Sequence, residues 1–311
     1  MKRLMIAVLF LLISSVAVGG NIPTTFYVDP TAGDDSNTGL ATDNAWKTVS
    51  KVNAFSRSNL LRQSEAIGTS PWNNTNDPVI STDNIVAPDG TMTAERIDQT
   101  KTNSQSYNGT TGVIPTDNNP VSLSLYIKNG DAVASRIDIR VQGGTNLIYS
   151  RTITWADNTV AVTGGTAAGA TSTFTPIGDG WFRLTITGNN NGTNNEATIY
   201  IYPDVSGETT KYIYAWGAQI ELGSVTPYVP TTTAAVTASF QPGDSILFKR
   251  GEALGLVVPS SGTASAPITF GMYGTGATPV FCNMNGKTGV ILPPEMCNLY
   301  APPFPLFPRT R

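Results

Sequence analysis

Strict alternation of apolar and polar residues is the clearest pattern in the middle of the chain. Residues 121–128 read VSLSLYIK, so every second side chain is apolar, and segments 136–142 and 181–186 repeat the pattern. Successive side chains of a strand point to opposite faces, so each segment predicts a strand with one apolar face. With the Gly/Asn/Asp turns between such runs, residues 57–238 predict an antiparallel jelly-roll sandwich, in an all-β protein.

A helical spacing of apolar residues precedes this region. After a short β run with Phe26 and Val28 in one phase, residues 45–55 predict an amphipathic helix with Asp43 as its N-cap. The apolar positions of this helix are Ala45, Trp46, Val49, Val52 and Phe55. A helix this short needs another surface on which to bury its apolar face. Residues 21–56 therefore predict a strand and a cap helix for a neighbouring unit.

The pattern changes again at residue 239. FQPGDSILFKRGE reads as a turn followed by a strand, and further short β runs follow, each cut by Gly or Pro. Such spacing is typical of the first rungs of a right-handed parallel β-helix, which we expect over 239–285. Residues 286–311 are rich in proline and predict an irregular tail. The sandwich is thus expected as an insertion into the start of a β-helix.

The first twenty residues predict an export signal. Lys2 and Arg3 precede an apolar run shorter than a membrane span, and small residues follow at 17–19. We expect a secreted, periplasmic or cell-surface protein without a membrane segment after cleavage. A membrane anchor is the alternative. Cys282 and Cys297 are the only cysteines, and whether they pair stays open.

Composition narrows the chemistry. The net charge of −3 predicts no nucleic-acid partner, and the absence of histidine excludes His-based nucleophile systems and metal sites. Asp34 and Asp35 fall in a polar loop, and no pair of carboxylates shows an acid/base spacing. The sequence therefore leans away from catalysis, although the question is not closed.

Two family resemblances follow from these segments. FYVDPTAGDDSNTG, AWKTVSKVNAF, FQPGDSILFKRGE and ASAPITFGMYGTGATPVF resemble the N-terminal part of pectate-lyase-like β-helix proteins. That resemblance implies a capping helix and first rungs, while the catalytic residues of such proteins lie on later rungs. NLLRQSEAIGTSPWNN, VAPDGTMTAERID, GDGWFRLTITG and YIYAWGAQIELGSVTPYVPTT resemble carbohydrate-binding-module-like sandwiches of phage tail and secreted glycan-active proteins. The second resemblance implies a jelly roll and a polysaccharide partner.

Candidate binding residues follow from the chemistry of sugars. Pyranose rings stack on aromatic side chains, and planar polar groups fix their hydroxyls. We therefore sought aromatic and charged residues on the polar faces or at the ends of predicted strands. These residues are Tyr126, Asp138, Arg140, Trp155, Trp181 and Arg183. If their strands are neighbours, they form one polar groove.

Alternative interpretations stay open for several of these positions. Trp181 could cover a sandwich edge while the charged residues are merely solvated, and Trp155 could be a rim platform or a lid on the core. Trp216 is expected in the core unless Gly217 forms a bulge. No cofactor is required. A structural calcium is a weaker hypothesis, with three oxygen donors near the ends of the segment: Glu65, Asp98 and Glu221.

Three functions are compatible with these patterns. The leading hypothesis is non-catalytic attachment to polysaccharide through the sandwich. The second is that the chain represents a truncated or frame-shifted fragment of a β-helix polysaccharide lyase or glycoside hydrolase. The third is a structural or adhesive module like those of tail fibres.

Overall fold

The computed structural model describes residues 21–110, 113–250, 253–255, 262–277 and 280–282. Among them are one 3-10 turn, η1 (Thr42–Asn44), one short helix, α1 (Val49–Ala54), and many strands. The strands are β1 (Thr25–Val28), β2 (Arg57–Asn59), β3 (Asn73–Thr75), β4 (Val79–Ile85), β5 (Ala94–Asp98), β6 (Gln105–Gly109), β7 (Pro120–Asn129), β8 (Ala134–Gln142), β9 (Leu147–Thr154), β10 (Thr159–Val162), β11 (Thr171–Gly178), β12 (Trp181–Asn189), β13 (Glu196–Tyr202), β14 (Tyr212–Leu222), β15 (Val236–Ala238), β16 (Ser245–Lys249), β17 (Ala253–Gly255), β18 (Thr269–Tyr273) and β19 (Val280–Cys282). No helix in the described part of the chain is long and apolar enough to cross a membrane.

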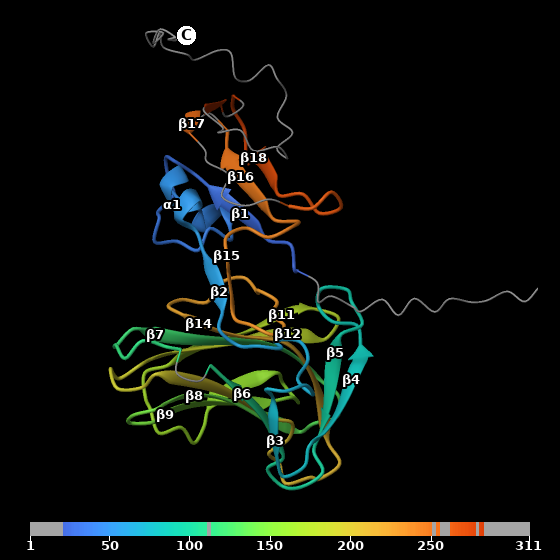
Figure 1. Ribbon diagram of the computed structural model, residues 1–311. Helices are drawn as coiled ribbons and strands as arrows, with labels where there is room; N and C mark the ends of the chain where they lie inside the picture. The colour runs from blue at the N-terminus through green and yellow to red at the C-terminus, as the bar shows by residue number, and fades with distance from the viewer. Residues whose placement is uncertain (1–20, 111–112, 251–252, 256–261, 278–279, 283–311) are drawn as a thin grey trace, which may run out of the picture.

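Two antiparallel six-stranded sheets form the sandwich (Figure 1). The β7 sheet has the order β11-β12-β7-β14-β5-β4, and the β8 sheet has the order β10-β9-β8-β13-β6-β3. Eight of these strands, β5 to β9 and β12 to β14, give the two four-stranded halves of a jelly roll, β5-β14-β7-β12 and β6-β13-β8-β9. The all-β class and the antiparallel jelly roll predicted from the sequence are confirmed.

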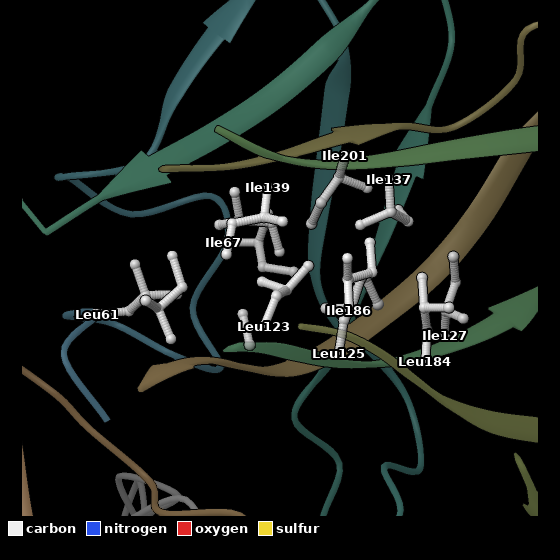
Figure 2. Packing of buried hydrophobic residues seen from close by; sticks show 14 of the residues in the cluster. Leu61, Ile67, Leu123, Leu125, Ile127, Ile137, Ile139, Leu184, Ile186 and Ile201 are labelled. Atoms are coloured by element: carbon white, nitrogen blue, oxygen red, sulfur yellow. The ribbon is translucent and has the colours of Figure 1, made fainter. Parts of the chain in front are cut away.

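The core between the sheets comes from the apolar faces of the alternating strands. Leu123 and Leu125 of β7 point toward Ile139 of β8 and Ile201 of β13, and all four are fully buried (Figure 2). Burying such a side chain stabilises the fold by about 1.5–3 kcal/mol. The predicted division of faces on β7, β8 and β12 therefore holds for their inward-facing residues.

Strand β14 changes faces halfway along its length. Gly217 has φ +62°, and the register with β7 shifts between Trp216 and Gln219. Because of this bulge, Ala218 and Ile220 point into the core, while Trp216 packs outside the β7 sheet against Tyr126 and Tyr228. The expectation that Trp216 shares the core face with Ile220 is wrong, and the bulge that the sequence left open is the reason.

A second unit contains a parallel sheet with the order β1-β16-β18. Phe26 and Val28 are buried in its own apolar cluster with Trp46, Val52 and Phe248. Strands β17 and β19 also pair in parallel. Parallel pairing over successive short strands is what the first turns of a β-helix require, but the β-helix itself stays a prediction.

The predicted helix over 45–55 is too long, and Asp43 is not its cap. Helix α1 covers Val49–Ala54 and is capped by Thr48, whose Oγ1 accepts from the Lys51 N–H at 3.0 Å. The backbone of Trp46 pairs instead with Tyr27 and Asp29 next to β1, so residues 45–47 are held outside the helix.

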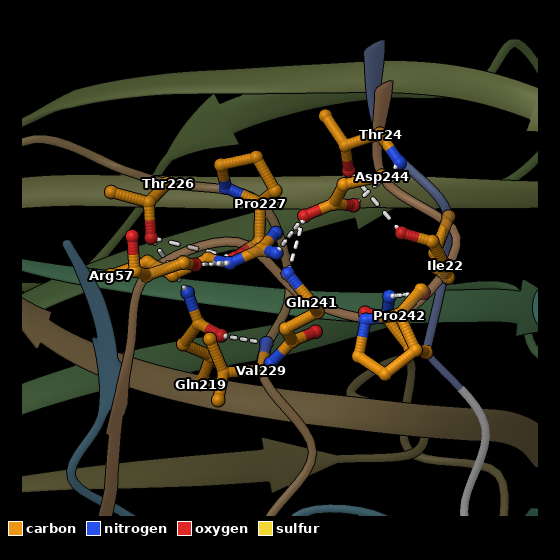
Figure 3. A network of polar contacts seen from close by, with 12 residues as sticks. Ile22, Thr24, Arg57, Gln219, Thr226, Pro227, Val229, Gln241, Pro242 and Asp244 are labelled. Atoms are coloured by element: carbon orange, nitrogen blue, oxygen red, sulfur yellow. Dashed lines mark hydrogen bonds and ion pairs between the residues drawn. The ribbon is translucent and has the colours of Figure 1, made fainter. Parts of the chain in front are cut away.

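The two units are joined by the antiparallel pair β2 and β15, where the chain enters and leaves the sandwich. Beside this pair, Arg57 forms an ion pair with Asp244, and both side chains are 0% exposed. Figure 3 shows Asp244 also accepting the N–H groups of Thr24 at 2.9 Å and Gln241 at 2.7 Å. The Arg57 Nε–H donates to the Ser239 carbonyl at 3.0 Å.

Several sequence expectations fall outside the described residues. The export signal at 1–20 and the tail at 286–311 lie there, and so does Cys297. These expectations stay predictions. The boundary near residue 57 coincides with β2 and the boundary near residue 238 with β15.

Candidate functional site

The predicted binding residues do not form one groove. Tyr126 and the pair Trp181 and Arg183 lie on β7 and β12 of the β7 sheet, whereas Asp138 and Arg140 lie on β8 of the other sheet. Both groups point away from the core, so they occupy opposite outer faces of the sandwich. The expectation of a shared groove is wrong, because alternation assigns a face to each strand but does not say which sheet contains it.

The outer face of the β7 sheet is covered by its own chain. Tyr126 is 4% exposed beneath Trp216 and Tyr228, and Arg183 donates to the Ser124 hydroxyl at 2.9 Å and the Thr226 carbonyl at 2.7 Å. The segment after β14 therefore occupies the place that a ligand would need.

Two of the predicted tryptophans are also enclosed. Trp181 is 3% exposed and donates from Nε1 to the Val86 carbonyl at 3.2 Å. Trp181 lines a hollow of about 580 Å³ beside Ile177, but only a small part of the Trp181 side chain is exposed there. Trp155 is a lid on the core, where it packs with Phe174 and donates to the Ser135 hydroxyl at 2.8 Å. Neither presents an open ring face.

The outer face of the β8 sheet is different, because planar side chains form a continuous row across it. Tyr107 of β6 stacks on Tyr200 of β13 with ring centroids 4.8 Å apart. The Arg140 guanidinium lies 3.7 Å from the centroid of Tyr200, and its Nη2 donates to the Tyr202 hydroxyl at 2.7 Å. Arg136 lies in the same way over Tyr202. Such stacks hold aromatic and guanidinium planes upright on a sheet.

Charge on this row is balanced around Asp138. Its carboxylate lies 3.0 Å from the Arg140 guanidinium and 3.2 Å from that of Arg136. Burial lowers the pKa of Arg140, but the hydrogen bond to Asp138 and the nearby Tyr202 outweigh it, so the pKa ends above its ordinary value. Burial raises the pKa of the Tyr200 phenol, which therefore stays protonated.

A pocket of about 170 Å³ lies at one end of the row. Tyr107 and Tyr200 line one part of it, and Gln142 and Glu196 line another. Gly109 is the β6 residue opposite Thr198, and a Cβ there would lie 2.7 Å from the Thr198 hydroxyl. A side chain at this glycine would therefore collide with the Thr198 hydroxyl, and Thr198 also lines the pocket. We call this the Tyr107 pocket.

The Arg62 guanidinium lies at the Tyr107 pocket and has no partner in the described residues. It can therefore donate hydrogen bonds to a ligand. Asn108 adds no acceptor to this face, because it is the β6 residue opposite the buried Ile199 and its side chain points into the sandwich. There it is 1% exposed and donates to the Arg62 carbonyl at 2.7 Å.

The sequence patterns did not identify Tyr107, Tyr200 and Tyr202 as candidate binding residues. A signal was present in ATIYIYPD, where Tyr200 and Tyr202 alternate with buried isoleucines. Tyr107 had no such pattern around it. The stack of Tyr107 on Tyr200 depends on the pairing of β6 with β13, which joins residues far apart in the sequence.

The three proposed calcium donors have other partners. Glu65 accepts from the Tyr228 hydroxyl at 3.0 Å, Asp98 pairs with Arg96, and Glu221 accepts from the Thr226 N–H at 2.9 Å. Among the described residues, no three Asp, Glu, Cys or His side chains are grouped so as to hold a metal ion. A structural calcium stays a prediction.

No protein-family model and no curated protein sequence matches the chain. Similar solved structures include the CBM22-1 xylan-binding domain of Paenibacillus barcinonensis Xyn10C, with 12% identity and a TM-score of 0.34 over 55% of this chain and 98% of that one. TmCBM61, solved in complex with β-1,4-galactotriose, has 10% identity and a TM-score of 0.31 over 53% of this chain and 98% of that one.

A domain of bacteriophage CBA120 tailspike protein 4, described as enzymatically active, has 14% identity and a TM-score of 0.34 over 61% of this chain. The match spans only 23% of the tailspike domain, and a match to a Clostridium thermocellum xylanase fragment spans 30% of that chain. With scores this low, the assignment of a function rests on the geometry of the β8 sheet.

Proposed function

We propose that the chain binds a polysaccharide on the outer face of the β8 sheet, without catalysis, as part of an exported protein. The stack of Tyr107 on Tyr200 beside the Tyr107 pocket carries this proposal. Sugar hydroxyls both donate and accept, and the side chains of Arg62 and Gln142 at the same pocket can donate to their oxygens. Tyr107 supplies the aromatic surface on which an apolar ring face rests.

The row beyond the pocket offers room for further sugar units. From Glu196 to Tyr202, β13 extends about 20 Å at the usual rise of a strand. Arg136 and Arg140 flank that path with polar edges. Among the residues that line the pocket, Glu196 is the only carboxylate, whereas glycoside hydrolysis ordinarily uses a pair. This favours attachment over cleavage.

Affinity gel electrophoresis of the full chain on xylan, galactan and glucan tests the proposal. We expect at least one polysaccharide to retard the protein, and Tyr107→Ala to weaken that binding about tenfold through the loss of ring stacking. Tyr214→Ala is the matched control, because Tyr214 is a half-buried tyrosine on the outer face of the other sheet. No retardation on any polysaccharide, or equal retardation of both variants, would refute the proposal.

A further inference from the structure

A second cavity lies where the sandwich meets the parallel-sheet unit. This junction cleft has a volume of about 310 Å³. Residues 36–38, Leu40, Lys51 and Phe55 line it from one unit, and residues 224–227 line it from the other. Ligand sites occur preferentially at such boundaries between units.

Both walls of the junction cleft are held firmly. On the sandwich side, the Thr226 N–H donates to Glu221 at 2.9 Å and the Thr226 carbonyl accepts from Arg183 at 2.7 Å. On the other side, the Trp46 Nε1–H donates to the Asn37 carbonyl at 3.0 Å. The buried ion pair of Arg57 with Asp244 joins the two units beside the cleft (Figure 3). The cavity is therefore preformed, which lowers the ordering cost of binding.

The charge of the cleft has one sign. Lys51 is the only charged residue that lines it, and the Lys51 ammonium has no hydrogen-bond partner in the described residues. Asp35 acts on Lys51 through its charge, but the Asp35 carboxylate already accepts the N–H of Lys47 at 2.9 Å and the N–H of Thr48 at 2.8 Å. Lys51 is thus available to an anion.

The remaining lining suits a sugar. The hydroxyls of Ser56 and Ser224 have no partners in the described residues, so they are free to bind ligand hydroxyls. Leu40 is 41% exposed, and with Phe55 and Val225 it supplies apolar surface for a ring face. From these contacts we infer that the junction cleft binds a carboxylated sugar residue, with its carboxylate on Lys51.

This site is separate from the Tyr107 pocket in place and in charge. The Tyr107 pocket contains Glu196, which repels a carboxylate, whereas no acid lines the junction cleft. The inference therefore does not rest on the proposed function.

Calorimetric titration of the full chain with a glucuronic acid oligosaccharide, and with its methyl ester, tests the inference. We expect the free acid to bind with an affinity that falls as salt rises, and the ester to bind at least tenfold more weakly. Lys51→Ala should weaken binding of the free acid about tenfold, and Lys51→Arg should retain it. Lys47→Ala is the control, because Lys47 lies just before the same helix but does not line the cleft.

Three results would overturn the inference. They are that the free acid does not bind, that the ester binds as tightly as the free acid, or that the Lys51→Ala variant binds the free acid as tightly as the wild type does. The Tyr107→Ala variant separates the two sites. It should leave binding of the acidic oligosaccharide unchanged, and loss of that binding would place the acid at the β8 sheet instead.

Discussion

At the scale of single residues, the half-buried Glu65 and the buried Glu95 have no ion-pair partner in the described residues. Burial, and next the repulsion from Asp83, raise the pKa of Glu95 to about 8, although the Gly68 N–H bound at 2.7 Å opposes this. Burial, and more weakly the charge of Asp89, raise the pKa of Glu65 to about 7, against the opposing hydrogen bond from Tyr228. Both residues therefore bind protons more tightly in the folded chain than in the unfolded chain.

These shifts predict that the protein is more stable in mild acid than in mild alkali. A carboxyl whose pKa rises from 4.5 to about 8 on folding loses stabilising energy as the pH increases through that interval. Glu95→Gln should remove much of this dependence and add several kcal/mol of stability at pH 9, since each unit of pKa shift is worth about 1.4 kcal/mol. Urea unfolding from pH 5 to pH 9 measures the pH dependence of the free energy of unfolding. A free energy of unfolding that rises with pH would contradict the prediction.

At the scale of strands and their neighbours, alternation identified the faces of β7, β8 and β12 from sequence alone, because one face of each had to be buried. Alternation could not identify which strands lie next to one another in a sheet. Asp138 was correctly placed on a polar face, yet β8 belongs to the other sheet from β7. The burial of Tyr126 could not be predicted from the sequence either, since it depends on how the segment after β14 folds back over the sheet. Sheet order and loop cover are long-range contacts that a local pattern does not encode.

Arg57 and Asp244 give a prediction at this same scale. Arg57→Met should lower stability by about 3 kcal/mol, because it leaves a buried carboxylate without its cation. The control is Lys101→Ala, which removes an ion pair with Asp77 whose side chains are 61% and 76% exposed. That variant should unfold as the wild type does, since exposed ion pairs contribute little. Equal urea midpoints for both variants would show that the junction does not depend on the pair.

At the scale of the whole molecule, the two ends of the sandwich lie side by side. Arg57 of β2 is paired with Ala238 of β15, so the chain leaves the parallel-sheet unit and returns to it at one place. The large core between the two sheets is made by residues of the sandwich alone, and the cluster around Phe26 and Trp46 belongs to the other unit. Each unit therefore has its own source of stability.

The separate cores predict that residues 57–238 fold when produced alone. The isolated sandwich should show β-rich circular dichroism and a cooperative thermal transition, because its apolar faces are buried within it. A reciprocal chain that joins residue 56 to residue 239 should be less stable, given the smaller cluster around Phe26. An isolated sandwich that melts without cooperativity would show that it needs the junction.

The paired strands β2 and β15 also determine how a mechanical load would pass through the protein. A pull on the sandwich reaches the other unit through two adjacent backbones that run side by side. The tension is shared between them and acts along both strands, so it does not unzip the hydrogen bonds that connect them. Resistance to force then depends on how well each end of the pair is embedded, with the Arg57 and Asp244 contact at one end.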